Sequence, residues 1–175
     1  MNPELGPNHS ENIFTSLKGQ LLSGEISPKE FKDKLVEIDQ STPDRANAKE
    51  NLKLLLDPEI VNFIENQSED IQKGYYQMLS FTELHIGQIK ALYENNPEEA
   101  LSYFEQSIEH EYKAHAFPEN IAYKSAIVAY FKNQPNELEK YIGTDERGNN
   151  PKILANMLKG LKERGYPNYK EDYKA

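Results

Sequence analysis

The segment that decides the fold spans residues 91–104 and reads ALYENNPEEALSYF. Its centre, Asn95-Asn96-Pro97, separates two stretches in which apolar residues recur at helical spacing. Asparagine is a good helix N-cap, and proline suits the first helical position because its missing N–H would have no acceptor there. The segment therefore predicts the end of one helix, a short loop, and the start of a second helix at Pro97.

Proline marks helix starts along the rest of the chain in the same way. Seven prolines stand at predicted helix starts, and five of the residues that precede them are good N-caps. Ser27 with Glu30 forms a predicted capping box at one of these starts. Few runs alternate as strands do, and no Asn-Gly or Asp-Gly hairpin signal occurs. We therefore predict an all-α protein of about nine helices joined by short loops. Seven of the ten prolines stand at predicted helix starts: Pro28, Pro43, Pro58, Pro97, Pro118, Pro135 and Pro151.

Composition narrows the classes of partner. The chain has 175 residues, a net charge of −9 and no cysteine. Its acidity repels polyanions, so we expect no nucleic acid partner and favour a basic or amphipathic protein or peptide. The absence of cysteine excludes disulfides and thiolate metal sites. Residues 1–12 lack the basic and apolar regions of a signal peptide, and no apolar run would span a bilayer. We expect a cytoplasmic protein without a membrane partner.

The decisive segment recurs further along the chain. Residues 129–138 read AYFKNQPNEL and align with residues 91–100 at an offset of 38 residues. A repeat of this size predicts stacked helical hairpins. Identical residues stand at four aligned pairs: Ala91 with Ala129, Asn95 with Asn133, Pro97 with Pro135, and Glu99 with Glu137.

Residues 95–108 resemble the second helix of a tetratricopeptide repeat. Ala100 and Ser107 stand at the family's close-contact positions, and Phe104 stands at its large core position. The match departs at the family's tryptophan and central glycine positions, which hold Leu84 and Gln88. The resemblance implies a short right-handed array of antiparallel hairpins, with an N-terminal helical hairpin and a C-terminal capping helix. A generic array of helical hairpins is the alternative.

The expected organisation has four parts. They are a disordered tail at 1–9, a helical hairpin at 10–40, a tetratricopeptide-like domain at 43–164 and a second tail at 165–175. Within the hairpin, residues 17–35 match an EF-hand only in part. The first, third and fifth positions of the calcium loop would be Gly19, Leu21 and Ser23, so the loop would offer calcium a single carboxylate, and we reject a calcium site. The same window resembles the short C-terminal domain, a small association or tethering module. A plain hairpin packed on the body is the alternative.

The tetratricopeptide resemblance also implies a binding groove lined by the first helix of each repeat. This surface is mostly apolar and aromatic, so it predicts recognition of an amphipathic helix or an apolar peptide. Burial of the same positions by flanking helices is the alternative. The implied partner-binding residues are Thr82, His85, Ile89, Leu92, Tyr93, Asn120, Tyr123, Lys124, Ile127, Tyr130 and Phe131.

The sequence offers no catalytic pattern. It has no glycine-rich phosphate loop and no Gly-x-Ser-x-Gly motif, and its carboxylates are expected on solvated helix faces. Glu111 and His115 share a predicted helix face, but no second Glu-x-x-His pair completes a metal site. We therefore predict no catalytic residue, metal or cofactor. The favoured function is a non-enzymatic protein-interaction module or adaptor. The alternative is a homo-oligomeric structural or regulatory protein that associates through its N-terminal hairpin.

Overall fold

The computed structural model describes residues 8–41, 47–94, 96–115 and 118–132, together with residues 134, 136, 159 and 163. Within these residues every regular element is a helix, which confirms the all-α prediction. About nine helices were predicted, and seven lie within these ranges; residues 136, 159 and 163 are helical as well. The seven helices are α1 (Asn8–Leu22), α2 (Pro28–Ser41), α3 (Ala48–Leu55), α4 (Pro58–Glu65), α5 (Glu69–Leu92), α6 (Pro97–Lys113) and α7 (Pro118–Phe131).

Four helices begin at the predicted prolines. Pro28, Pro58, Pro97 and Pro118 are the first residues of α2, α4, α6 and α7. The side chain of the residue before proline caps three of these helices, α2, α4 and α6, by accepting a backbone N–H, as its type predicts. The predicted starts at Pro43, Pro135 and Pro151 lie outside the described residues.

The predicted capping box at the start of α2 is confirmed. The backbone N–H of Ser27 donates to Oε2 of Glu30 at 2.8 Å, and the backbone N–H of Glu30 donates to Oγ of Ser27 at 3.2 Å. Between α1 and α2, Gly24 has a φ of +76°, a left-handed conformation that costs glycine little. The sharp turn brings α2 back beside α1.

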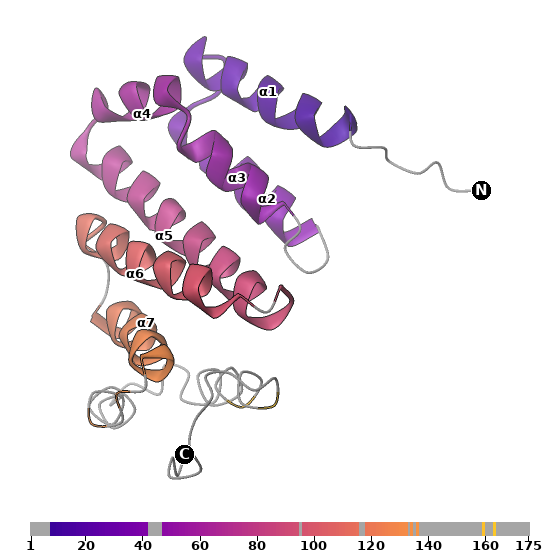
Figure 1. The fold of residues 1–175 in the computed structure, drawn as a ribbon. Coiled ribbons are helices and arrows are strands. Elements are labelled where there is room, and N and C mark those ends of the chain that lie inside the picture. Colours follow the sequence, from indigo (N-terminus) through magenta and orange to yellow (C-terminus); the bar gives the residue numbers. More distant parts are fainter. Residues whose placement is uncertain are drawn as a thin grey trace.

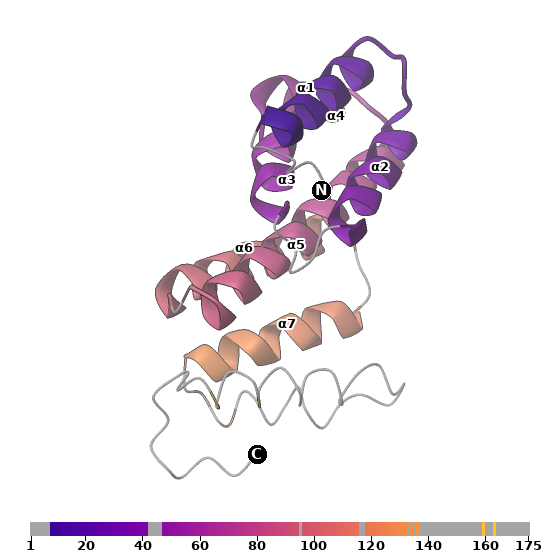
Figure 2. The same cartoon turned by 90° about the vertical axis from the view of Figure 1, so that its right-hand side faces the viewer.

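The helices pack around two hydrophobic cores that meet at α5. Figures 1 and 2 show α1 to α4 on one side of the α5–α6 pair and α7 on the other side. The first core is formed by α1 to α5 and includes the fully buried Leu21, Leu35 and Leu55. The second core is formed by α5, α6 and α7 around Phe104 and Ile127. The predicted N-terminal hairpin therefore shares its core with α3, α4 and α5.

Small residues allow α5 and α6 to pack closely as an antiparallel pair. Ser80 of α5 contacts Ser107 of α6, and Gly87 of α5 lies against Phe104 of α6. Ala100, Phe104 and Ser107 of α6 are fully buried. The glycine at the close contact is Gly87, one residue before the position matched to the family's glycine.

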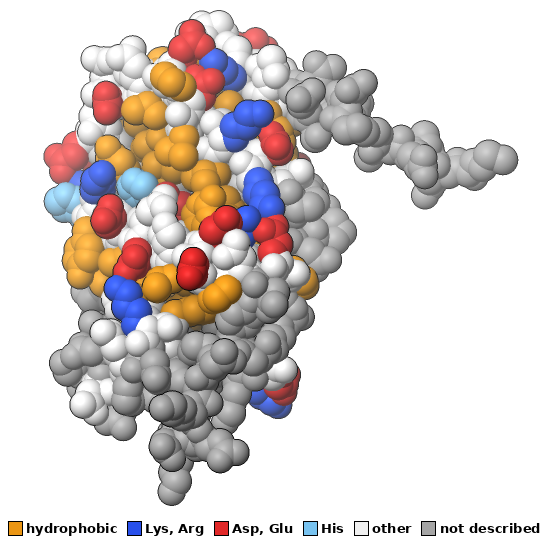
Figure 3. Space-filling view, in the orientation of Figure 1, with side chains coloured by type: hydrophobic (Ala, Val, Ile, Leu, Met, Phe, Trp, Pro, Cys, Tyr) orange, Lys and Arg blue, Asp and Glu red, His pale blue; other side chains and the backbone are white. Residues whose placement is uncertain are grey.

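The surface carries several exposed hydrophobic side chains. On the face shown in Figure 3, hydrophobic side chains gather over α4 and the neighbouring part of α5, bordered by acidic and basic side chains. Among the described residues, no helix combines the length and apolar character needed to cross a membrane. Within the described part of the chain, the large hydrophobic residues that remain exposed are Ile13, Val36, Leu56, Phe81, Tyr93 and Tyr112.

Candidate functional site

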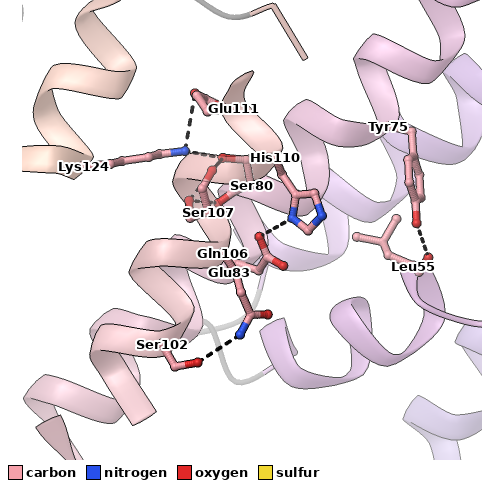
Figure 4. Close-up of polar contacts among 10 residues, drawn as sticks. All are labelled: Leu55, Tyr75, Ser80, Glu83, Ser102, Gln106, Ser107, His110, Glu111 and Lys124. Atoms are coloured by element: carbon pink, nitrogen blue, oxygen red, sulfur yellow. Dashed lines mark hydrogen bonds and ion pairs between the residues drawn. The ribbon is translucent and has the colours of Figure 1, made fainter. Parts of the chain in front are cut away.

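A buried polar network joins α5, α6 and α7 (Figure 4). The hydroxyl of Ser80 donates to the backbone carbonyl of Ser107, and the hydroxyl of Ser107 donates to the carbonyl of Ser80, each at 2.5 Å. Both serines are fully buried. Because each hydroxyl bonds to the facing backbone, the pair fixes the register of α5 against α6.

Lys124 extends this network from α7. Its Nζ donates to Oγ of Ser80 and lies 3.3 Å from Oε1 of Glu111 on α6. Lys124 and Glu111 are each only 3% exposed. Burial lowers the pKa of Lys124, and the adjacent Glu111 carboxylate opposes that shift. The ion pair therefore attaches α7 to the α5–α6 pair through charges that are removed from water.

A second polar pair lies between α5 and α6 beside the serines. Nδ1 of His110 is 2.8 Å from Oε2 of Glu83, which is 1% exposed, and the ring of Tyr76 stacks on His110 with centroids 5.8 Å apart. The expectation that carboxylates occupy solvated faces is wrong for Glu83 and Glu111. Each is buried because a cationic or hydrogen-bonding partner from a neighbouring helix meets it.

The Ser80–Lys124 contact also resembles the chemistry in which a lysine base activates a serine nucleophile. A nucleophile must be accessible to substrate, whereas Ser80 is fully buried and its hydroxyl donates to the Ser107 carbonyl. This geometry favours a structural role for the network.

Three of the predicted groove residues on α5, Thr82, His85 and Ile89, contact the N-terminal helices or their core. Thr82 and His85 are buried, and Nδ1 of His85 lies 3.2 Å from Oδ2 of Asp39 on α2. Ile89 packs against the first core. Tyr93, at the end of α5, is 61% exposed. The side chain of Leu92 lies outside the described residues.

The predicted groove residues on α7 lie in a different environment. Lys124, Ile127 and Tyr130 are buried, and Tyr123 and Phe131 pack at the edge of the second core. Asn120 is half-buried near the start of α7. The structure thus divides the predicted set between the two cores, and a partner-binding role for these residues stays a prediction.

A hollow of about 250 Å³ lies between α2, α3 and α5. Phe81 and Val36 lie at its edge and are 55% and 37% exposed. Of the predicted partner-binding residues, Thr82 is the one that lines it. Sequence spacing could not reveal this hollow, because its walls come from three helices. The residues that line it are Lys32, Leu35, Val36, Asp39, Asn51, Gln77, Met78, Phe81 and Thr82.

Two residues that line this hollow each carry a buried oxygen with unmet hydrogen-bonding capacity. Oδ1 of Asp39 and Oδ1 of Asn51 are both buried, and neither has a hydrogen-bond partner in the structure as described. Asn51 is only 2% exposed. Because neither oxygen has surface exposed to water, a molecule that enters the hollow does not reach them without a shift of the surrounding side chains.

In the described ranges, no group of three or more His, Asp or Glu side chains lies closely enough together to hold a metal ion. Glu111 pairs with Lys124, while His115 follows the end of α6 with a φ of +52°.

No family model, curated protein or solved structure matches the chain. Function is therefore inferred from the hollow and from the buried network.

Proposed function

We propose that this chain is a non-enzymatic protein-interaction module that accepts a side chain of a partner protein in the hollow between α2, α3 and α5. The supporting observation is a partly apolar hollow of about 250 Å³ with an exposed aromatic residue, Phe81, at its edge. Pockets for drug-sized ligands are commonly about 300–1,000 Å³, so a smaller hollow suits a single inserted side chain.

The composition of the hollow supports an anchoring role. Protein interfaces derive most of their affinity from a few large side chains that fill well-packed pockets. Leu35, Met78 and Val36 supply apolar walls, while Phe81 offers aromatic surface that a partner would bury. An amphipathic helix that presents one long side chain fits these features. The resemblance of residues 95–108 to a tetratricopeptide repeat also supports an interaction role. We further propose that the chain has the antiparallel hairpin arrangement of that family and that it is cytoplasmic.

The test is affinity purification from the native cell, followed by mass spectrometry, with matched surface variants. Phe81→Ala removes the aromatic edge of the hollow, whereas Tyr112→Ala removes a similarly exposed ring from α6. We expect partners recovered with the unmodified chain to be lost with Phe81→Ala and kept with Tyr112→Ala. Full recovery of the same partners by a folded Phe81→Ala variant would contradict the proposed site.

The groove predicted from the resemblance needs its own variant. Tyr123 is partly buried at the edge of the second core, while Tyr130 is 3% exposed. Tyr123→Ala is therefore the better probe, because Tyr130→Ala would also remove a core side chain. Loss of partners with Tyr123→Ala but not with Phe81→Ala would place the binding site on α7.

Self-association through the N-terminal hairpin is the second candidate function. Ile13 on α1 is 42% exposed, which supplies an apolar contact on that hairpin. Deleting residues 1–40 would remove Phe14, Leu17 and Leu21 from the first core, so Ile13→Asp is the cleaner variant. Light scattering that finds an oligomer in the unmodified chain and a monomer in Ile13→Asp would support this function. A monomer in both would exclude it.

A further inference from the structure

The hollow between α2, α3 and α5 has two exposed apolar side chains at its edge. Phe81 on α5 is 55% exposed, and Val36 on α2 is 37% exposed. The ring of Phe81 packs against His85 in a T-shaped contact, with the two ring centroids 4.3 Å apart. A ring that is already held on one side loses less conformational freedom when a partner covers the other side. We call the hollow together with Phe81 and Val36 the α2–α5 patch.

The hollow has room for an aromatic ring. Its volume is about 250 Å³, whereas an apolar cavity of about 150 Å³ in another protein is large enough to bind benzene. Leu35 and Met78 supply apolar wall, and the flexible methionine side chain adapts to the edge of a ring. Because Phe81 is 55% exposed, its ring does not fill the hollow of its own chain.

The charge of the lining suits contact between identical chains. Each chain has a net charge of −9, so two copies repel each other at long range. Among the described residues that line the hollow, Lys32 is the basic residue and Asp39 is the acidic one, so the lining has no net charge. Two copies that meet through the α2–α5 patch therefore avoid placing surfaces of like charge against each other.

We propose that the hollow accepts Phe81 of a second copy of this chain in a two-fold symmetric dimer, an inference that rests on the proposed interaction function. A two-fold contact uses the same patch on both chains, so the patch must be complementary to itself. The α2–α5 patch meets this condition, because it carries an exposed ring and a hollow large enough for one. Each dimer contains two identical insertions, and Val36 adds apolar surface beside them.

The first test is sedimentation velocity of the full chain over a range of concentrations. We expect the unmodified chain to pass from monomer to dimer as its concentration rises. Burial of one phenylalanine ring is worth about tenfold or more in affinity, and the dimer buries two. Phe81→Ala should therefore weaken the dimer by about 100-fold or more. Tyr112→Ala, which removes an exposed ring from α6, should leave the dissociation constant unaltered.

A second pair of variants tests the charge of the patch. Lys32→Glu removes the base from the lining and adds an acid, so two facing patches should then repel each other. We expect the dimer to weaken by about tenfold or more, and added salt should reduce this effect. Lys34→Glu is the matched control, because it changes the net charge equally at an exposed position of α2 outside the hollow.

Mixing two defective variants gives the sharpest test. Gln77 is exposed and lines the hollow, so Gln77→Trp should obstruct the hollow and leave Phe81 in place. Phe81→Ala has the opposite defect, because it keeps the hollow and lacks the ring. Each variant alone should dimerise weakly, whereas an equimolar mixture should form a heterodimer that regains one of the two insertions. Circular dichroism establishes that both variants keep the helix content of the unmodified chain.

Four results would each overturn the inference. They are an unmodified chain that stays monomeric even at millimolar concentration, a dimer that Phe81→Ala does not weaken, a dimer that Gln77→Trp does not weaken, and a mixture without heterodimer. The first result needs no variant, so it holds even where a variant fails to fold. A monomeric unmodified chain that loses cellular partners on Phe81→Ala would remove the second copy and leave the interaction function intact.

Discussion

Gly87 on α5 lies so close to the ring of Phe104 on α6 that a Cβ at position 87 would stand 2.6 Å from Cε1 of that ring. Real Cβ atoms do not approach other atoms so closely, and Phe104 is fully buried. Position 87 on α5 therefore requires glycine as long as position 104 on α6 holds a side chain as large as phenylalanine. It also explains how two helices with a large aromatic residue between them remain closely packed.

We expect Gly87→Ala to destabilise the protein by about 1–3 kcal/mol, because overlap with Phe104 outweighs the gain in helix propensity. The matched control is Gly74→Ala on the same helix, where an added Cβ meets nothing within 4 Å. That change should stabilise by about 0.5–1 kcal/mol. Urea denaturation measures both. The double variant Gly87→Ala with Phe104→Leu should lose less unfolding free energy than the sum of the losses of the two single variants, because the smaller side chain relieves the overlap. A loss equal to that sum would exclude the overlap.

Removal of one partner from the Lys124–Glu111 pair should be costly. Lys124→Met leaves the Glu111 carboxylate buried without a cation, so we expect a loss of about 3–5 kcal/mol in unfolding free energy. Lys124→Met with Glu111→Leu should recover most of that loss, because no charge is then left uncompensated. Lys132→Met, which breaks an exposed pair with Glu105, is the control and should cost less than about 1 kcal/mol. A small effect of Lys124→Met alone would show that solvent reaches the pair.

The hydroxyl of Tyr75 donates to the backbone carbonyl of Leu55 at 2.6 Å, which connects α5 to the end of α3. Burial raises the pKa of this phenol, so it stays neutral and keeps donating at ordinary pH. Tyr75→Phe should lower stability by about 1–2 kcal/mol, because a buried carbonyl loses its donor. Tyr112→Phe, at an exposed position, should have no measurable effect. Thermal denaturation of the two variants side by side tests this contact.

The capping box of α2 predicts a dependence of stability on pH. The backbone N–H and hydroxyl of Ser27 hold the pKa of Glu30 below its ordinary value of 4.5. The contribution of Glu30 is therefore present above that value and is lost as the pH falls through the lower, folded-state pKa. Glu30→Gln should be less stable than the unmodified chain at about pH 7, and the difference should shrink by about pH 2.

Urea midpoints at several pH values test the capping box. Glu37→Gln, an exposed change on the same helix, controls for the loss of one negative charge. A difference between Glu30→Gln and the unmodified chain that is independent of pH would show that the carboxylate is not responsible.

The sequence predicts best what depends on neighbours in the chain. The starts at Pro58 and Pro97 follow from the preceding Asp57 and Asn96, because a cap acts within one helical turn. The close-contact position of Ala100 came from the resemblance to a tetratricopeptide repeat, and the residue is fully buried.

The network and the hollow required the tertiary fold. Ser80 and Lys124 are separated by 44 residues, and no pattern in the chain indicates that their side chains meet. Asp39 and Asn51 are ordinary polar residues in sequence, and only the packing of α2 and α3 on α5 places them at the same hollow. Composition predicts solvated carboxylates, so Glu83 and Glu111 could not be distinguished from the surface acids.

Both cores depend on α5, and this has a consequence for the order in which the chain gains stability. Met78, Leu79 and Ile86 of α5 belong to the first core, and Leu84 and Ala91 belong to the second. During synthesis, α1 to α4 expose apolar surface until α5 has emerged, and α5 then presents a second apolar face that waits for α6 and α7. Amide hydrogens in the middle of α5 should exchange only when both cores open, which makes them the slowest in the described part of the molecule.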